Sequence, residues 1–134
     1  MARAFRLLLA ALCALLVASA AAAIKVPHLT RKTFDNTVND GRTHFIKCGH
    51  CRKLAPTWGK LYEATKDDAA IGVASVDCTK ERKVCDKAGV ERFPSLFIYQ
   101  DGKQGERYQG ERSYDSLRKY LDSHTVKVEA KEEL

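Results

Sequence analysis

The sequence predicts an α/β fold, in which helices flank both faces of a mixed sheet. Short apolar runs of strand length alternate with segments whose apolar residues recur every three or four positions, as on one face of a helix. The expected order is strand, helix, strand, helix, strand, helix, then a hairpin and a final helix. That order favours parallel and antiparallel neighbours within one sheet. The chain has 134 residues, enough for one such domain.

The first 23 residues are expected to lie outside this domain. Residues 1–6 carry two arginines, residues 7–17 are an apolar run and residues 18–23 are small. This order is typical of a secretory signal peptide, here cleaved at a point between residues 20 and 23. A buried N-terminal helix is the alternative. The apolar run is too short to span a membrane, so no membrane insertion is expected.

The remaining chain is moderately basic. The net charge of +6 falls to +4 when the two arginines of the signal segment leave. Basic and acidic residues are interspersed along the sequence, without the basic stripe of a nucleic-acid-binding protein. We therefore expect no nucleic-acid partner.

The first elements of the domain are predicted from apolar spacing and turn residues. A short strand is expected at residues 26–29, and Thr30 can cap a helix that runs to about Asn39. Asp40-Gly41 predicts a turn, and the apolar run at residues 43–47 then predicts a strand.

The middle of the chain alternates between helix and strand. Residues 51–66 are expected to form a helix, kinked by Pro56, because their apolar residues follow helical spacing. Residues 71–76 predict a second strand. Residues 79–88 predict a short helix that ends at Gly89.

The last part of the chain predicts a hairpin and a helix. A continuous apolar strand is expected at residues 96–99, and Asp101-Gly102 is a hairpin turn from which residues 107–109 pair back. Ser113 can cap the final helix, and a charged, mobile tail is expected after Ser123. The residues of that helix expected to face inward are Leu117, Tyr120 and Leu121.

The pair Cys48 and Cys51 is the strongest candidate for chemistry. Cysteines separated by two residues can close a small disulfide ring, and unpaired N–H groups at a helix start would hold the first cysteine as a thiolate. A protonated His50 would add a favourable charge. We therefore expect Cys48 to attack a substrate disulfide and Cys51 to resolve the mixed disulfide. Half of a zinc site, or an inert structural disulfide, is the alternative.

Several motifs resemble the protein disulfide isomerase family. Cys48-Gly49-His50-Cys51 matches the active-site motif of that family, and residues 52–58 match its active-site helix. Val76-Asp77-Cys78-Thr79 matches its third strand, and Phe93-Pro94-Ser95-Leu96 matches its cis-proline segment. Residues 108–117 match its last strand and helix. The resemblance spans residues 26–123. It implies a thioredoxin-like fold and the exchange of disulfides in client proteins.

The resemblance also implies roles for individual residues. Pro94 would be cis and, with Phe93, would lie opposite the cysteines and pair with substrate; an ordinary trans proline is the alternative. Arg112 would approach Cys51 during turnover and lower its pKa. The alternative for Arg112 is a solvated side chain at a helix start.

A second pair, Cys78 and Cys85, is bridged in some members of the family. Such a bridge would hold a strand end to the short helix, and two buried free thiols are the alternative. The separation of seven residues is poor for the second half of a zinc site, so no metal is expected. Because four cysteines follow the signal segment, their even number favours an oxidising compartment.

The sequence departs from the family directly before the motif. The family has several more residues between strand and cysteines, whereas here Lys47 is bonded directly to Cys48. Lys47 also takes the position of a buried glutamate that is thought to move protons for the second cysteine. A shortened loop, a strand that ends early and a segment missing from this sequence all remain open. We expect the central strand to shorten and the helix to begin near Cys48.

These features predict a thiol-disulfide oxidoreductase and isomerase of the endoplasmic reticulum lumen. The domain is expected at residues 24–124, followed by a charged tail at residues 125–134 whose last four residues, KEEL, resemble a retention signal. Expected partners are unfolded or misoxidised secretory proteins, a redox partner such as glutathione or a thiol oxidase, and a retention-signal receptor. No cofactor is required. A redox-impaired or thiol-independent chaperone that binds clients is the alternative.

Overall fold

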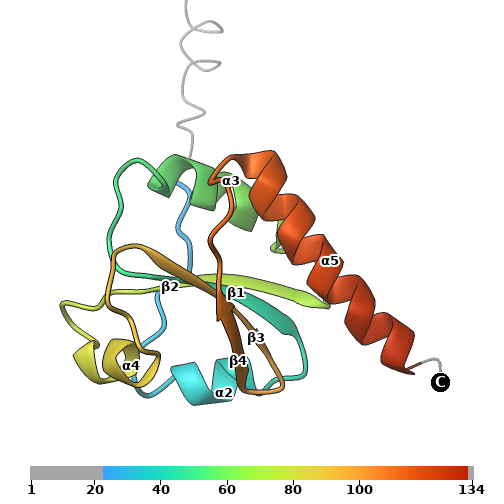
Figure 1. Cartoon of the computed structure of the whole chain (residues 1–134), viewed down its shortest axis with the longest axis horizontal. Coiled ribbons are helices and arrows are strands. Elements are labelled where there is room, and N and C mark those ends of the chain that lie inside the picture. Colours follow the sequence, from blue (N-terminus) through green and yellow to red (C-terminus); the bar gives the residue numbers. More distant parts are fainter. Residues whose placement is uncertain (1–22, 133–134) are drawn as a thin grey trace, which may run out of the picture.

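The computed structural model describes residues 23–132 of the 134-residue chain, with side chains through residue 125 (Figure 1). The predicted signal peptide up to residue 22 and the last two residues of the predicted retention signal lie outside this range.

Four strands form one mixed sheet in the order β2-β1-β3-β4. The strands are β1 (Thr43–Cys48), β2 (Ile71–Val76), β3 (Ser95–Gln100) and β4 (Lys103–Arg107). β1 lies in the interior of the sheet, parallel to β2 and antiparallel to β3, and β4 pairs antiparallel with β3. The predicted mixed sheet is confirmed.

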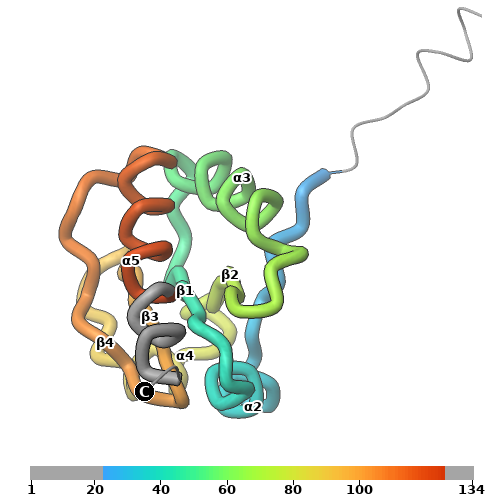
Figure 2. The backbone as a smooth tube through the Cα atoms, turned by 90° about the vertical axis from the view of Figure 1, so that its right-hand side faces the viewer, coloured from blue at the N-terminus to red at the C-terminus, as the bar shows by residue number. Residues whose placement is uncertain are grey.

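Helices cover both faces of this sheet, as Figures 1 and 2 show. They are α2 (Phe34–Val38), α3 (Ala55–Thr65), α4 (Arg82–Lys87) and α5 (Tyr114–Glu132). α2 and α4 pack on one face and α3 and α5 on the other, each pair closing its own buried cluster. Because side chains alternate along a strand, Phe45 of β1 joins the α3/α5 cluster and Ile46 joins the α2/α4 cluster.

The strand predicted at residues 26–29 is reduced to a single bridge between His28 and Ser75. The Leu29 N–H donates to the Ser75 carbonyl at 2.8 Å, and the Ser75 N–H donates to the Pro27 carbonyl at 2.9 Å. Since Pro27 has no N–H to donate, the pairing does not extend further.

The two helices on the α2/α4 face begin later than predicted. α2 follows a turn in which the Thr30 carbonyl accepts a hydrogen bond from the Phe34 N–H at 2.9 Å. α4 begins after Thr79, whose N–H donates to an Asp77 carboxylate oxygen at 2.9 Å in a local turn. Gly89, at φ +68°, ends α4 as predicted.

The hairpin after β3 turns at the predicted residues. Asp101 and Gly102 have φ values of 49° and 73°, as a two-residue type I′ turn requires. So short a turn lets pairing resume at once, and β4 therefore lies at Lys103–Arg107 and not at the predicted residues 107–109.

The last helix is capped as predicted and is longer than predicted. The Ser113 hydroxyl accepts a hydrogen bond from the Ser116 N–H at 3.3 Å. The expectation that the chain leaves the helix after Ser123 is wrong, because α5 continues to Glu132. Thr125 is buried within this extension, and its hydroxyl donates to the Leu121 carbonyl at 3.0 Å.

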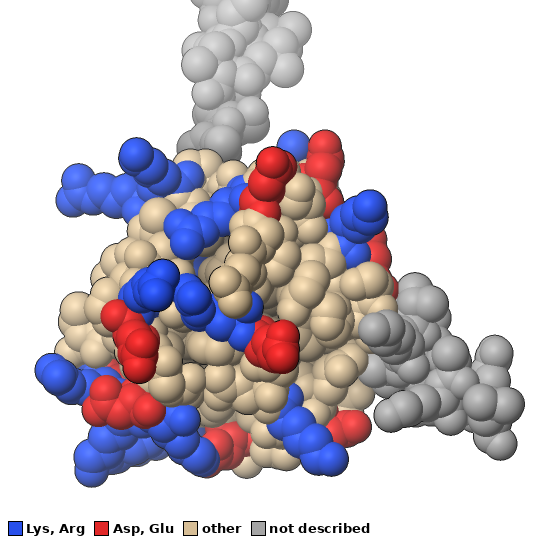
Figure 3. All heavy atoms as spheres, viewed as in Figure 1, with Lys and Arg blue, Asp and Glu red and all other residues tan. Residues whose placement is uncertain are grey.

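Basic and acidic side chains are interspersed over the face in Figure 3, as their distribution along the sequence suggests. Within residues 23–132, none of the helices combines the length and apolar character needed to cross a membrane.

Candidate active site

β1 runs directly into the cysteine motif. Cys48 is its last residue and pairs with Val76 of β2 and Ser95 of β3, and the Gly49 N–H extends the ladder by donating to the Val76 carbonyl at 3.0 Å. The strand predicted at residues 43–47 therefore extends one residue further, through Cys48. Neighbouring strands are available on both sides, so the backbone groups of Cys48 are satisfied in the ladder.

The helix after the motif begins well beyond Cys48. α3 starts at Ala55, and the loop before it includes a turn in which the Ala55 N–H donates to the Cys51 carbonyl at 3.1 Å. The expectation of a helix start near Cys48 is wrong for the same reason, since Cys48 belongs to the sheet. Pro56 occupies the first turn of α3, where a proline is tolerated without a kink.

Cys48 is completely buried, with 0% of its surface exposed, in the α2/α4 cluster. Burial raises the pKa of its thiol from 9.0 to about 12, because a thiolate loses its hydration there. The prediction that a helix N-terminus lowers the pKa of Cys48 is thus not met by the structure. No helix end lies at this residue.

Cys51 has a different environment. It is half-buried and packs against the α3/α5 cluster, on the opposite face of the sheet from the cluster around Cys48. Both are free thiols. The structure therefore does not bring the two sulfurs of the predicted redox disulfide together, and it leaves Cys51 as the more accessible thiol.

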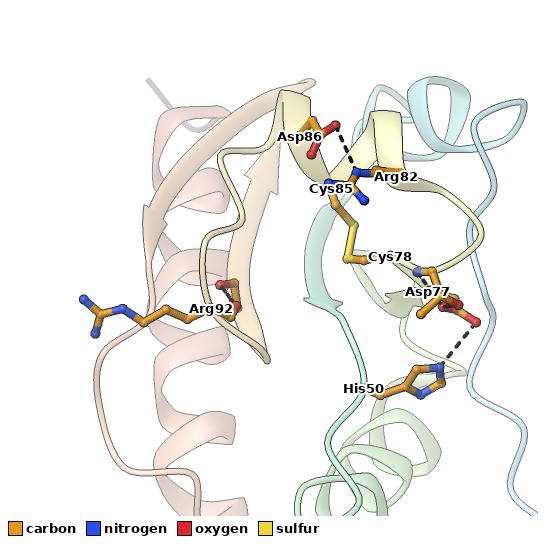
Figure 4. Close-up of a disulfide and its surroundings, with 9 residues drawn as sticks. His50, Asp77, Cys78, Arg82, Cys85, Asp86 and Arg92 are labelled. Atoms are coloured by element: carbon orange, nitrogen blue, oxygen red, sulfur yellow. Dashed lines mark hydrogen bonds and ion pairs between the residues drawn. A yellow bond between two sulfur atoms is a disulfide. The ribbon is translucent and has the colours of Figure 1, made fainter.

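His50 turns toward the loop that follows β2. Its side chain is 69% exposed, and its Nε2 lies 3.3 Å from a carboxylate oxygen of Asp77 (Figure 4). Hydrogen bonds from Thr79, together with His50, lower the pKa of Asp77 to about 2 against a smaller effect of burial. Asp77 was missed in the sequence. Its place just after β2 signals this contact, since the carboxyl ends of parallel strands meet at one edge.

The Phe93–Pro94 peptide bond is cis, as the resemblance implied. Pro94 is buried directly before Ser95, the ladder partner of Cys48, so the cis-proline loop lies beside the motif. Gly49 has a φ of +90°, and a side chain there would meet the Phe93 ring. The ring itself remains 61% exposed.

A cavity of about 450 Å³ opens beside this loop. Its walls include Gly49, His50, Phe93 and Val90, together with the bridged pair Cys78 and Cys85. Most of this lining is apolar.

The Cys78–Cys85 disulfide joins the loop after β2 to α4 (Figure 4). This is the pairing that the resemblance implied, and it holds the wall of the cavity together. Arg112, by contrast, is exposed in the loop before α5 and forms no ion pair within the described residues. Its predicted approach to Cys51 stays a prediction.

The mixed sheet with helices on both faces, and the cis-proline loop beside a C-x-x-C motif, define a thioredoxin fold. The Thioredoxin family model matches residues 25–123. Protein disulfide-isomerase 5-1 of Arabidopsis thaliana is 32% identical over 112 residues, which cover 79% of this chain and 77% of that protein. The chain therefore belongs to the thioredoxin family, and within it to the protein disulfide isomerases.

Other relatives are much longer. A thioredoxin domain-containing protein 5 homolog of Drosophila melanogaster is 36% identical over 103 residues, and this chain spans 24% of its length. Of the solved structures, the J-Trx1 fragment of ERdj5 superposes with a TM-score of 0.68 at 33% identity, over 75% of this chain and 51% of that one. The first two thioredoxin domains of Eps1p from Naumovozyma dairenensis give a TM-score of 0.70 at 26% identity, over 78% and 42%.

Proposed function

We propose that the chain catalyses thiol-disulfide exchange on substrate proteins, with Cys51 as the reacting thiol. The observation that carries this assignment is the contrast between the two cysteines of the motif. Cys51 is half-buried, whereas Cys48 is completely buried in the opposite cluster and its pKa is raised to about 12. The thiolate is the nucleophile in exchange, so the more accessible thiol reacts first.

With one reacting thiol, the exchange is an isomerisation. The Cys51 thiolate attacks one sulfur of a substrate disulfide, a mixed disulfide forms, and the other substrate sulfur leaves as a thiolate. A second thiolate of the substrate then attacks the mixed disulfide, closing a new substrate disulfide and releasing the Cys51 thiolate. No electrons are gained or lost overall. Net oxidation or reduction would need Cys48 as the partner of Cys51.

The names of the relatives, together with the predicted signal peptide and the predicted retention signal, support a cellular compartment for this activity. We propose disulfide-containing clients of the secretory pathway as substrates, in the endoplasmic reticulum lumen. Glutathione or a thiol oxidase would set the redox state of Cys51, and a retention-signal receptor would recognise the chain end.

Refolding of scrambled ribonuclease in a glutathione buffer tests the assignment. We expect Cys51→Ser to abolish the recovery of ribonuclease activity and Cys48→Ser to retain most of it. The reverse pattern, in which Cys48→Ser alone abolishes recovery, would return the attacking role to Cys48. Insulin reduction provides a second measurement, and there we expect the wild type to be weak because it requires both thiols.

Client binding without thiol chemistry is a second candidate, favoured by one observation. Phe93 is 61% exposed beside the largely apolar cavity of about 450 Å³, and an exposed aromatic side chain of this kind suits unfolded segments. Suppression of client aggregation by the Cys48→Ser/Cys51→Ser double variant would support this role. We expect Phe93→Ser to weaken that suppression, and loss of all suppression in the double variant would exclude the role.

A further inference from the structure

Lys47 is a largely buried basic residue whose ammonium group keeps some contact with solvent. It precedes Cys48 in β1, its surface is only 8% exposed, and its side chain forms no hydrogen bond or ion pair with another residue of the described chain. Burial lowers its pKa, against a smaller opposing effect of Cys51. A charge that is partly removed from water costs free energy, which a nearby anion can offset.

The Lys47 side chain lines a cavity of about 740 Å³ on the α3 side of the sheet. The cavity lies between the start of α3, the end of β1 and the N-terminal segment 24–28, which Figure 2 shows as the blue stretch of the tube. This cavity shares no lining residue with the one beside Phe93. It is therefore a separate candidate site.

The lining of this cavity combines basic and apolar residues. Besides Lys47, its polar side chains are Lys25, His28 and Ser75, and no Asp or Glu of the described chain is among its lining residues. The apolar residues of the walls are Ile24, Val26, Pro27, Ala55, Pro56 and Trp58. Apart from the nearby Cys51 thiol, whose thiolate form favours the Lys47 ammonium, the lining of the cavity offers that ammonium no anion.

We propose that this cavity binds a small amphiphilic carboxylate. The carboxylate would accept hydrogen bonds from the Lys47 ammonium and compensate its charge, and the apolar body would lie against Trp58 and Pro56. A cavity of about 740 Å³ falls within the size range of small-molecule sites, roughly 300–1,000 Å³. A free acid and the carboxyl terminus of an apolar peptide share this chemistry. The proposal does not depend on the exchange activity of Cys51.

Trp58 provides the measurement, because it lines the cavity and is the only tryptophan of the chain. We would titrate the full chain with octanoate and follow the tryptophan fluorescence, with octanamide as the uncharged control. We expect saturable binding of octanoate and binding of octanamide weaker by about tenfold or more, the value of a charged hydrogen bond. An apolar peptide with a free or an amidated carboxyl terminus distinguishes the second source in the same way.

Variants locate the site. Lys47→Met is expected to lose the preference for octanoate over octanamide, Lys47→Arg to retain it, and Lys119→Met on the exposed surface of α5 to leave it unchanged. Without ligand, Lys47→Met should melt at the same or a higher temperature than the wild type, because it removes a partly desolvated charge. Equal affinity of the wild type for octanoate and octanamide, or an unchanged preference in Lys47→Met, would overturn the proposal.

Discussion

The burial of Cys48 makes a quantitative prediction about its reactivity. A thiol whose pKa rises from 9.0 to about 12 holds roughly one thousandth of the thiolate that an ordinary thiol holds near neutral pH. Because alkylation proceeds through the thiolate, an alkylating reagent should modify Cys48 about 1,000-fold more slowly in the folded protein than in the unfolded chain. Complete burial excludes the reagent as well, so this factor is a lower bound.

In the chain without its first 23 residues, which contain Cys13, variants with a single free thiol separate Cys48 from Cys51 within their one short segment. In Cys51→Ala, iodoacetamide should label Cys48 in the folded protein about 1,000-fold more slowly than in guanidinium, as followed by intact mass. In the matched variant Cys48→Ala, labelling of Cys51 should be much less sensitive to folding. If folded Cys48 is labelled within about tenfold of its unfolded rate, the thiol is not held in the buried strand and the reasoning fails.

Three further predictions concern stability. Cys85→Ser should lower the free energy of unfolding by about 2–3 kcal/mol in guanidinium, because it opens the small loop closed with Cys78, and a reducing agent should then have no further effect. Folding raises the pKa of Cys48 from 9.0 to about 12, so the stability that its neutral thiol contributes is present below pH 9 and lost as the pH rises toward 12. In urea unfolding, the free energy of unfolding of Cys48→Ala should therefore depend less on pH between 9 and 12 than that of the wild type. Gly49→Ala should cost about 1–3 kcal/mol, because φ is +90° there and the new methyl group meets the Phe93 ring, and Phe93→Ala should relieve part of that cost in the double variant.

Much of the sheet could be predicted because its strands have strong local signals. β2 has the predicted bounds, residues 71–76, and the hairpin turn at Asp101-Gly102 follows from residues that tolerate positive φ. The strand at residues 26–29 was predicted from apolar residues alone. Its single bridge shows that Pro27 outweighs them, since a proline cannot donate to a ladder.

The candidate site could be predicted only in part. The resemblance implied both the cis bond at Pro94 and the Cys78–Cys85 bridge, features that no local propensity of the sequence predicts. The environment of Cys48 differs from the prediction because the ladders with β2 and β3 extend through this residue, ahead of the helix signals that follow the motif. Alternation along β1 contains the correct signal, since Cys48 follows Ile46 by two positions and so shares its buried face.

The direct bond between Lys47 and Cys48 therefore decides which thiol is available, and an insertion can test this. Adding Ala-Gly-Ser between the two residues would place the alanine at the buried position between Val76 and Ser95, and the glycine at the left-handed position that Gly49 now occupies. Cys48 would then move into the loop, where it no longer loses hydration to the core. In the Cys51→Ala background we expect the inserted variant to be labelled by iodoacetamide about 100-fold or more faster than its parent, approaching the rate of the unfolded chain. Labelling that stays as slow as in the parent would mean that the position of Cys48 along the strand is not the cause of its low reactivity.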